Sequence, residues 1–396
     1  MPQSRRPPPS SSSPSSSSSS PSSAPKRDKT SANRKRNTST SASTSTSSTS
    51  TSVQSDPRTV NPLVLSQFKS ILNTFRLSFS HLFTPELPQI IQSVKHSLYL
   101  RDYVAAFDSP QKLQAYVVRW SVARALAYFD MISGGWWSEH VTHIFTSTTA
   151  ATPPNNLSIT CVGGGAGAEI VGIAAAYSFL NSSSSPSSSP QRLDLTLLDF
   201  ATWAPITDSL YTTLITDSSR DPTKPDIFLD KSRFSAKCHQ QDVLTPLSDT
   251  TISSMASADI VTILFTAGEL YSQSPTATTK FLMSLHALTK PGALLVVVDS
   301  AGGFEDLDVL NKKKNSSKNN DNTQTNSNPT DGAIGGYKLG FLLDKTLTNR
   351  EQWQTVVSHD AKWWRVPQQL KDIGGYPLEL ENMRCLIRVY RRNSDP

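Results

Sequence analysis

The chain has 396 residues and a net charge of +6, and its three cysteines lie far apart with no CxxC pair, so neither zinc nor a disulfide framework is indicated. Residues 1–58 hold nine Lys/Arg against two Asp/Glu, while the rest holds 29 basic and 30 acidic residues, so the positive charge does not indicate a basic groove in the folded part. No apolar run approaches the roughly 20 residues of a membrane span and no signal-peptide core follows Met1, so we expect a soluble protein.

The first 58 residues consist of Ser, Thr, Pro and basic residues with almost no apolar side chains. Such a segment cannot bury enough surface to offset its ordering entropy, so we predict a disordered tail. Its basic clusters, at 26–29 and 34–36, fit a nuclear address or a loose RNA contact and fit solubilising charges equally well. A transit peptide is disfavoured because the apolar content is too low for an amphipathic helix.

Residues 59–150 are predicted to form a helical subdomain. Apolar side chains recur there at three- and four-residue spacing, which predicts amphipathic helices, over 63–82, 88–98 and 113–129. Three arginines in this region have two interpretations: they are salt-bridge partners, or they belong to a cap over the site that follows. These arginines are Arg101, Arg119 and Arg124.

The stretch after this subdomain carries the strongest local signal. Leu157–Val162 is a short apolar run suited to a buried strand, and helical spacing resumes over about 166–180. Between them, four glycines fall within five residues: Gly163, Gly164, Gly165 and Gly167. A strand, a glycine turn and a helix together let backbone N–H groups approach a nucleotide closely. The alternative is a tight turn without a ligand.

Two acidic residues follow the next predicted strands. Asp199 ends the strand 193–198, where a carboxylate lies beside the ribose hydroxyls in Rossmann-type units. Its distance from the glycines exceeds the usual ~20 residues, and the low-complexity insert 181–190 accounts for much of the excess. Asp242 follows the strand 234–239 and is the candidate partner of an adenine amine. Asp199 could instead cap its strand without a ligand.

The remaining elements continue the alternation. A fourth strand, at 258–265, ends in Phe265 and is followed by Glu269, at the sheet edge where ligands bind in open α/β folds. Further on, the sequence predicts a helix at 276–289, a fifth strand at 294–300 and a low-complexity insert at 311–330. An amphipathic helix at 349–358, an aromatic-basic patch at 362–365 and a last strand at 383–390 complete the chain.

The assembled pattern resembles the class I S-adenosylmethionine-dependent methyltransferases. The motifs that carry this resemblance are GGGAGAE after the first strand, the acids after the second and third strands, and LTKPGALLVVVDS around the fifth. A nicotinamide-dependent oxidoreductase competes, because the glycines also satisfy GxGxxA. The absence of a second domain after the sheet and the strand-like end of the chain argue against it. More narrowly, CVGGGAGAEI, RDYVAAF and YVVRWSVARALAYFD resemble the fungal 25S ribosomal RNA (uridine-N3) methyltransferases.

This resemblance implies a Rossmann-like doubly wound α/β sheet over 151–392, preceded by the helical subdomain and the tail. It implies S-adenosylmethionine as cofactor, ribosomal RNA or a pre-ribosomal particle as partner, no membrane and no metal, a monomer, and a nuclear or nucleolar location with the cytoplasm left open. A catalytically silent RNA- or protein-binding relative is a further alternative. The candidate cofactor-binding residues are Gly163, Gly164, Gly165, Gly167, Glu169, Asp199, Asp242, Phe265 and Arg119.

Methylation at a uridine N3 also requires removal of its proton, and therefore a general base or a polarising environment. Glu269 is the first candidate base and Asp299 the second, although either could be a hydrogen-bonding acid at a strand end. Many class I enzymes carry an acid just before the glycines, where this chain has Cys161 and Val162. Glu169 either helps to hold the glycine loop or is a helix N-terminal acid favoured by the dipole. Candidate stacking surfaces are Trp136, Trp137, Trp363 and Trp364, although tryptophan pairs more often pack in a core or subdomain.

Overall fold

The computed structural model describes residues 60–146, 156–182, 191–215, 229–302, 338–373 and 375–394. The predicted disordered tail and the insert at 311–330 lie outside these residues, as does nearly all of the insert at 181–190. Within the described ranges, none of the helices is both long and apolar enough to cross a membrane.

The N-terminal region is helical, as predicted. Asn61 caps the first helix by accepting a hydrogen bond from the Leu63 N–H. The predicted helix over 113–129 is divided by a π-helical segment, η2, and the last helix before the sheet, α6, was not predicted. In order, the elements are α1 (Pro62–Ser78), η1 (Ser80–Leu82), α2 (Leu87–Tyr99), α3 (Tyr103–Ala106), α4 (Pro110–Tyr116), η2 (Val117–Ser121), α5 (Val122–Ser133) and α6 (Glu139–Thr146).

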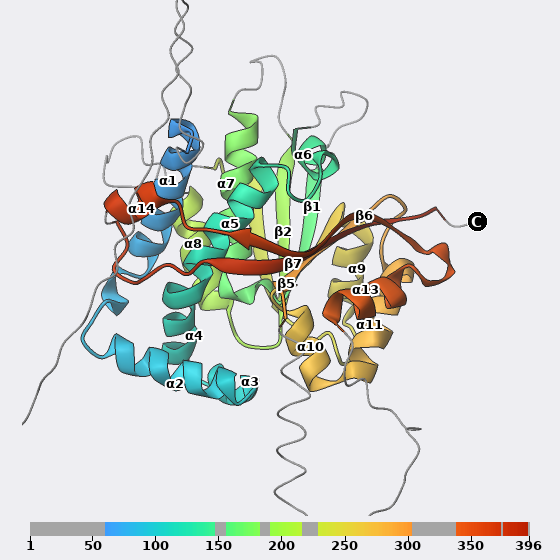
Figure 1. The fold of residues 1–396 in the computed structure, drawn as a ribbon, viewed down its shortest axis with the longest axis horizontal. Coiled ribbons are helices and arrows are strands. Elements are labelled where there is room, and N and C mark those ends of the chain that lie inside the picture. The colour runs from blue at the N-terminus through green and yellow to red at the C-terminus, as the bar shows by residue number, and fades with distance from the viewer. Residues whose placement is uncertain are drawn as a thin grey trace, which may run out of the picture. The chain divides into compact units, whose positions relative to one another are not determined.

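A seven-stranded sheet follows, in the order β3-β2-β1-β4-β5-β7-β6 (Figure 1). Strands β1 to β5 are parallel, and β7 runs antiparallel to β5 and β6. The predicted doubly wound α/β fold is therefore confirmed, and the predicted last strand forms β7, which runs in the opposite direction to its neighbours. The strands are β1 (Asn156–Val162), β2 (Arg192–Asp199), β3 (Phe234–Gln240), β4 (Ile260–Leu264), β5 (Leu294–Ser300), β6 (Trp353–Trp364) and β7 (Met383–Arg392).

Helices cover both faces of the sheet, with α1, α5, α7 and α8 on one side and α9, α10, α11 and α13 on the other (Figure 1). Alternate residues of a strand point to opposite faces, so in β5 Val296 joins the first core and Val297 the second. The connecting elements are η3 (Gly164–Ala166), α7 (Ala168–Asn181), α8 (Ala204–Ile215), α9 (Asp249–Ser257), α10 (Ala267–Gln273), α11 (Pro275–Leu288), α13 (Leu339–Leu347), η4 (Asn349–Glu351) and α14 (Gln368–Ile373).

The N-terminal helices share the first core with the sheet. Helix α5 crosses α7 at Gly172, where a Cβ would lie 2.8 Å from the Ala125 carbonyl oxygen. Phe129, on α5, packs edge-on against Phe68 of α1 and Phe179 of α7, with ring centroids 5.4 and 5.6 Å apart. These ring contacts hold the C-terminal part of α5, and just before its other end the Ser121 hydroxyl donates to the Ala166 carbonyl oxygen of the glycine turn at 2.7 Å.

The amphipathic helix predicted over 349–358 is wrong, because most of that stretch belongs to β6. Two register shifts interrupt its pairing with β7, after Thr355 and after His359, so the apolar side chains lose the strict alternation of a regular strand. The β-branched run Thr355–Val357 was the signal for a strand. The helix of this region, α13, comes before it.

Candidate active site

The glycine turn carries the chain from β1 to α7 beneath the end of β4. Gly163 and Gly167 have φ values of +76° and +81°, a left-handed conformation that side chains with a Cβ rarely adopt. A Cβ on Gly163 would overlap the side chain of Thr266, and one on Gly167 would overlap Leu210. The turn therefore needs glycine for its backbone conformation and for its tight packing against the two neighbouring elements.

Asp199 at the end of β2 is tied to this turn. Its Oδ2 atom accepts a hydrogen bond of 3.1 Å from the Gly165 N–H, and Oδ1 accepts one of 3.3 Å from the Ala201 N–H. Burial raises the pKa of Asp199 to about 6, although these backbone donors act in the opposite direction. The carboxylate is thus held rigidly where the turn and β2 meet.

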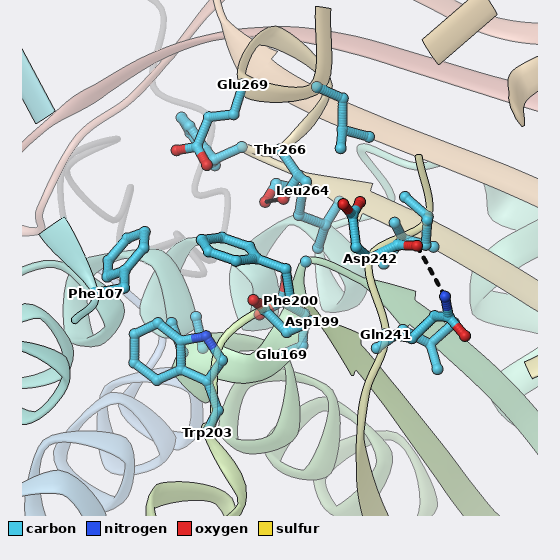
Figure 2. Close-up of a pocket in the computed structure, with 18 of the residues that line it drawn as sticks. Phe107, Glu169, Asp199, Phe200, Trp203, Gln241, Asp242, Leu264, Thr266 and Glu269 are labelled. Carbon is cyan, nitrogen blue, oxygen red and sulfur yellow. Dashed lines mark hydrogen bonds between the residues drawn. The ribbon is translucent and has the colours of Figure 1, made fainter. Parts of the chain in front are cut away.

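These elements line a pocket that holds about 730 Å³ of empty space, part of it open to solvent. In Figure 2, Asp199 and Trp203 lie on one wall, Gln241 and Asp242 on a second, and Thr266 and Glu269 above them. Of the predicted site residues, the pocket is lined by Gly163, Glu169, Asp199, Asp242, Phe265 and Glu269. The other three glycines build the turn behind this wall.

The Asp242 side chain also closes the turn after β3, because its Oδ1 atom accepts a 2.9 Å hydrogen bond from the Leu244 N–H. The neighbouring Gln241 amide donates to the Asp242 carbonyl oxygen at 2.8 Å (Figure 2). Buried Val243 and Leu198 add an apolar surface to this end of the pocket. The wall therefore combines an apolar surface with a fixed carboxylate.

Glu169 lies at the start of α7 and is almost fully buried, with 3% of its surface exposed. Burial raises its pKa to about 8, while Arg124 acts in the opposite direction. The Tyr128 hydroxyl lines the same pocket, and no hydrogen-bond partner for it occurs among the described residues. A buried acid and a buried unpartnered hydroxyl give this end of the pocket unused hydrogen-bonding capacity.

Arg124 supplies the positive charge of the pocket. Its Nη1 atom donates to the Tyr116 hydroxyl at 2.5 Å, and its guanidinium carbon lies 4.7 Å from the centre of the Phe265 ring. The structure does not bring Arg119 into this pocket: Arg119 pairs with Glu381 and donates to the Glu379 carbonyl oxygen at 3.0 Å. From the sequence we predicted Arg119 as the cofactor-binding arginine and named Arg124 only as one of three arginines in the helical subdomain.

The two candidate bases differ in their surroundings. Both Asp299 oxygens accept backbone hydrogen bonds, of 2.8 Å from the Gly268 N–H and 2.7 Å from the Ser300 N–H. No such donor to the Glu269 carboxylate occurs in the described part of the chain, and burial raises the pKa of Glu269 to about 8. Asp299 is therefore a fixed acceptor, whereas Glu269 is the acid with lone pairs to spare. Across the residues described, no group of three or more His, Cys, Asp or Glu side chains could hold a metal ion.

The four tryptophans predicted as stacking surfaces differ in how deeply they are buried. Trp137 and Trp364 are packed inside, each 1% exposed, and the Trp364 indole donates to Asp130 at 2.9 Å. Trp136 is covered by Lys362, whose Nζ atom lies 3.8 Å from the ring centre. Trp363 is the exposed member of the four, at 52%.

Comparison with known proteins agrees with this geometry. The family described as "Putative SAM-dependent methyltransferase" matches residues 75–391. The chain belongs to this family. It thereby belongs to the S-adenosylmethionine-dependent methyltransferases, as the sequence motifs indicated, and the nicotinamide-dependent alternative is set aside.

A Saccharomyces cerevisiae relative, named 25S rRNA (uridine(2843)-N(3))-methyltransferase, is 26% identical over 351 residues, covering 82% of this chain and 86% of the relative. Among solved structures, a SAM-dependent methyltransferase from Methanosarcina mazei is 10% identical, covers 61% of this chain and 94% of its own, and has a TM-score of 0.33. An N-methyltransferase from Bradyrhizobium japonicum, in complex with S-adenosyl-L-homocysteine, is 12% identical, covers 77% and 99%, and has a TM-score of 0.31.

The pocket fits the family's cofactor. S-adenosylmethionine carries a sulfonium and an ammonium group, one carboxylate and two ribose hydroxyls. The pocket offers several carboxylates and one guanidinium, and the buried Asp199 lies where a ribose is bound in Rossmann-type units. Gly163 of the turn lines the pocket, so a ligand can reach the backbone there.

The first test concerns Gly165. A Cβ there would overlap the Trp203 indole and lie 2.8 Å from the Asp199 Cβ. We expect Gly165→Ala to displace both side chains and to weaken binding of S-adenosyl-L-homocysteine at least about tenfold, as measured by calorimetry. Gly375→Ala is the matched control, since its Cβ would make an ordinary contact, 3.9 Å from the Leu72 Cδ1 atom. Equal affinities in the two variants would contradict this role of the turn.

Proposed function

We propose that this protein transfers a methyl group from S-adenosylmethionine to N3 of a uridine in large-subunit ribosomal RNA. The observation that carries the proposal is the Glu269 carboxylate, which lies at the carboxyl end of β4, lines the pocket and has no hydrogen-bond donor among the described residues. The yeast relative is named for this reaction and supports the choice of acceptor.

In this proposal the chain's own residues hold the cofactor in the first pocket. Asp199 accepts hydrogen bonds from the ribose hydroxyls, and Asp242, beside the apolar surface of Val243 and Leu198, accepts one from the adenine amine. Arg124 pairs with the methionine carboxylate, and Glu169 and the Tyr128 hydroxyl lie at the same end as Arg124. When bound, S-adenosylmethionine supplies a methyl group on a sulfonium sulfur, which keeps the electron pair of the broken bond.

The acceptor nitrogen needs a base. A uridine N3 carries a proton, which passes to a Glu269 carboxylate oxygen as the N3 electron pair forms the new bond to carbon. Because the pKa of Glu269 is raised to about 8, the ionised form that accepts the proton becomes more populated as the pH rises. A positively charged ligand in the same pocket would favour that form further.

The RNA itself requires a surface outside the pocket. N3 lies on the Watson–Crick edge, so the uridine must be unpaired or extruded to reach a pocket. Near the end of β6, exposed Trp363 lies beside the Arg365 guanidinium, whose carbon is 4.9 Å from the ring centre. Trp363 also pairs across the sheet with exposed Arg384. An exposed aromatic ring with arginines nearby suits binding of RNA, because a base can stack on an aromatic ring while cations neutralise the phosphates.

We expect Trp363→Ala to weaken binding of large-subunit ribosomal RNA fragments, since each base stacked on an aromatic ring contributes about 1–3 kcal/mol, or roughly 5- to 150-fold in Kd. Binding of S-adenosyl-L-homocysteine should stay unchanged. Tyr99→Ala is the control, because Tyr99 is also an exposed aromatic residue, at 72%, but lies on α2. A similar loss of RNA affinity in both variants would remove Trp363 from the RNA surface.

The proposed function itself is tested by nucleoside mass spectrometry of large-subunit ribosomal RNA from cells that lack the protein. Loss of N3-methyluridine, restored by the wild type and not by Glu269→Gln, is the expected result. An unchanged nucleoside profile would contradict the proposal and would favour the catalytically silent alternative. With this substrate we also propose a nuclear or nucleolar location, where ribosomal RNA is made, which a fluorescent fusion would test.

A further inference from the structure

A second cavity adjoins the first one across Arg124 and Phe265, which line both. It holds about 550 Å³ of empty space, part of it open to solvent. Its polar lining comes from Arg101 and Tyr103 at the start of α3, from Glu269 on α10 and from Asp299 at the end of β5. Glu269 lines both cavities, so a group that it contacts is accessible from either side.

The backbone is strained at this cavity. Four non-glycine residues of the described chain have positive φ values, and two of them, Arg101 at +58° and Phe265 at +55°, line it. Residues in such sparsely populated conformations persist where the surrounding structure holds them, often at functional sites. Arg101 is held from both sides: its Nη1 atom contacts the Ser272 hydroxyl of α10 at 3.5 Å, and the following Asp102 caps α3 through a 2.9 Å bond from the Ala105 N–H.

The polar groups of the cavity divide into hydrogen-bond donors and acceptors. Guanidinium groups only donate, and the Tyr103 hydroxyl can donate as well, whereas the Glu269 carboxylate accepts when ionised. Tyr103 is close enough to Glu269 and Arg101 for both charges to influence its pKa, which burial and Glu269 raise and Arg101 lowers. The two Asp299 oxygens already accept backbone hydrogen bonds. Donors and one available acceptor therefore share a single small space.

This combination matches one nucleobase edge. The Watson–Crick edge of uracil presents two carbonyl oxygens on either side of one N–H, and loss of the N3 proton places negative charge on those oxygens. Cytosine presents an amino group at one of these positions and has no proton at N3. Bound in the same orientation as uracil, it would place a donor against a donor and an N3 lone pair against the carboxylate. Arginine and tyrosine donors beside a carboxylate therefore favour uracil.

We propose that this second cavity is the binding site of the acceptor base, where Arg101 and Tyr103 donate to the uracil carbonyl oxygens and so select uridine over cytidine. The inference rests on the proposed function, because it names the residues that recognise the acceptor of that reaction. Arg124, Phe265 and Glu269 line both cavities, so a base in the second cavity lies next to the cofactor site.

Arg101→Gly tests the proposal. It removes the guanidinium, and glycine tolerates the left-handed backbone, so folding should be preserved. Glu351→Gly is the matched control: its φ is +57°, and Glu351 lies in η4 and does not line either cavity. The substrate is large-subunit ribosomal RNA from cells lacking the protein, together with RNA fragments that carry uridine or cytidine at the methylated position. The readouts are single-turnover methylation, fragment affinity, S-adenosyl-L-homocysteine affinity and melting temperature.

For Arg101→Gly we expect methylation to fall at least about a hundredfold and the preference for the uridine fragment to disappear, with cofactor-product affinity and melting temperature unchanged. Tyr103→Phe should reduce the same preference, and Glu351→Gly should behave as the wild type. An Arg101→Gly variant that keeps the uridine preference overturns the proposal, and so does one that loses affinity for S-adenosyl-L-homocysteine, since Arg101 would then serve the cofactor. If the wild-type protein forms no N3-methyluridine on this RNA, the result contradicts the proposed function itself.

Discussion

We expect Glu269→Gln to lower kcat for uridine methylation by about 10²–10⁴-fold, the usual contribution of a positioned general base. Glutamine keeps the shape of the side chain but cannot accept the N3 proton. In the wild type, kcat/KM should rise with pH through about 8, the pKa of Glu269 in the free protein, because only the ionised form is a base. This limb should vanish from the pH profile of Glu269→Gln.

Asp299→Asn is the comparison that separates a base from a buried acid. Because Asp299 accepts hydrogen bonds from the Gly268 and Ser300 N–H groups, its replacement should lower the melting temperature and leave the pH limb in place. If the limb moved or disappeared in Asp299→Asn and persisted in Glu269→Gln, the roles of the two acids would be reversed.

The sheet was readable from the sequence because most of its strands are buried runs of apolar residues. The fifth strand, LLVVVDS, is an example, and its bounds agree with β5. Strand β6 was missed because it lies at the edge of the sheet, is largely exposed and contains two register shifts. An exposed, irregular strand has no apolar period, so only its β-branched residues pointed to it.

The glycine turn and Asp199 were also readable, because both belong to a local strand–turn–helix pattern. The positions of Arg119 and Arg124 were not. They lie close in sequence, but Arg119 belongs to the π-helical segment Val117–Ser121 and Arg124 to the α-helix after it, so the helical register changes between them. Segments of this kind occur frequently at functional sites. The contacts that decide their roles are distant in sequence: Arg119 meets Glu381, and Arg124 meets Phe265. Such contacts cannot be predicted from the residue pattern of a short stretch of sequence.

The difference between these arginines gives the second large expected effect. Arg124→Met should weaken binding of S-adenosyl-L-homocysteine by about 2–3 kcal/mol, or roughly 30- to 150-fold in Kd, because the methionine carboxylate of the ligand would lose a half-buried charged partner. Arg119→Met is the control from the same helical stretch: its partner is Glu381, which is half exposed, so the change should alter Kd less than about twofold. Calorimetry on both variants, with their melting temperatures, gives the comparison.

Loss of Arg124 also has an effect that would strengthen ligand binding, because the pocket is rich in acids and Arg124 is its positive charge. Removing Arg124 would leave Glu169 and Glu269 to attract the cationic groups of S-adenosylmethionine more strongly, if both stayed ionised. They do not, since both pKa values are raised to about 8 even with Arg124, which lowers each of them, and they rise further without it. At pH 7 the two acids are therefore mostly neutral with or without Arg124, and the loss of the carboxylate's partner dominates. Tighter binding by Arg124→Met, or a loss of affinity confined to Arg119→Met, would show that Arg124 does not hold the ligand's carboxylate.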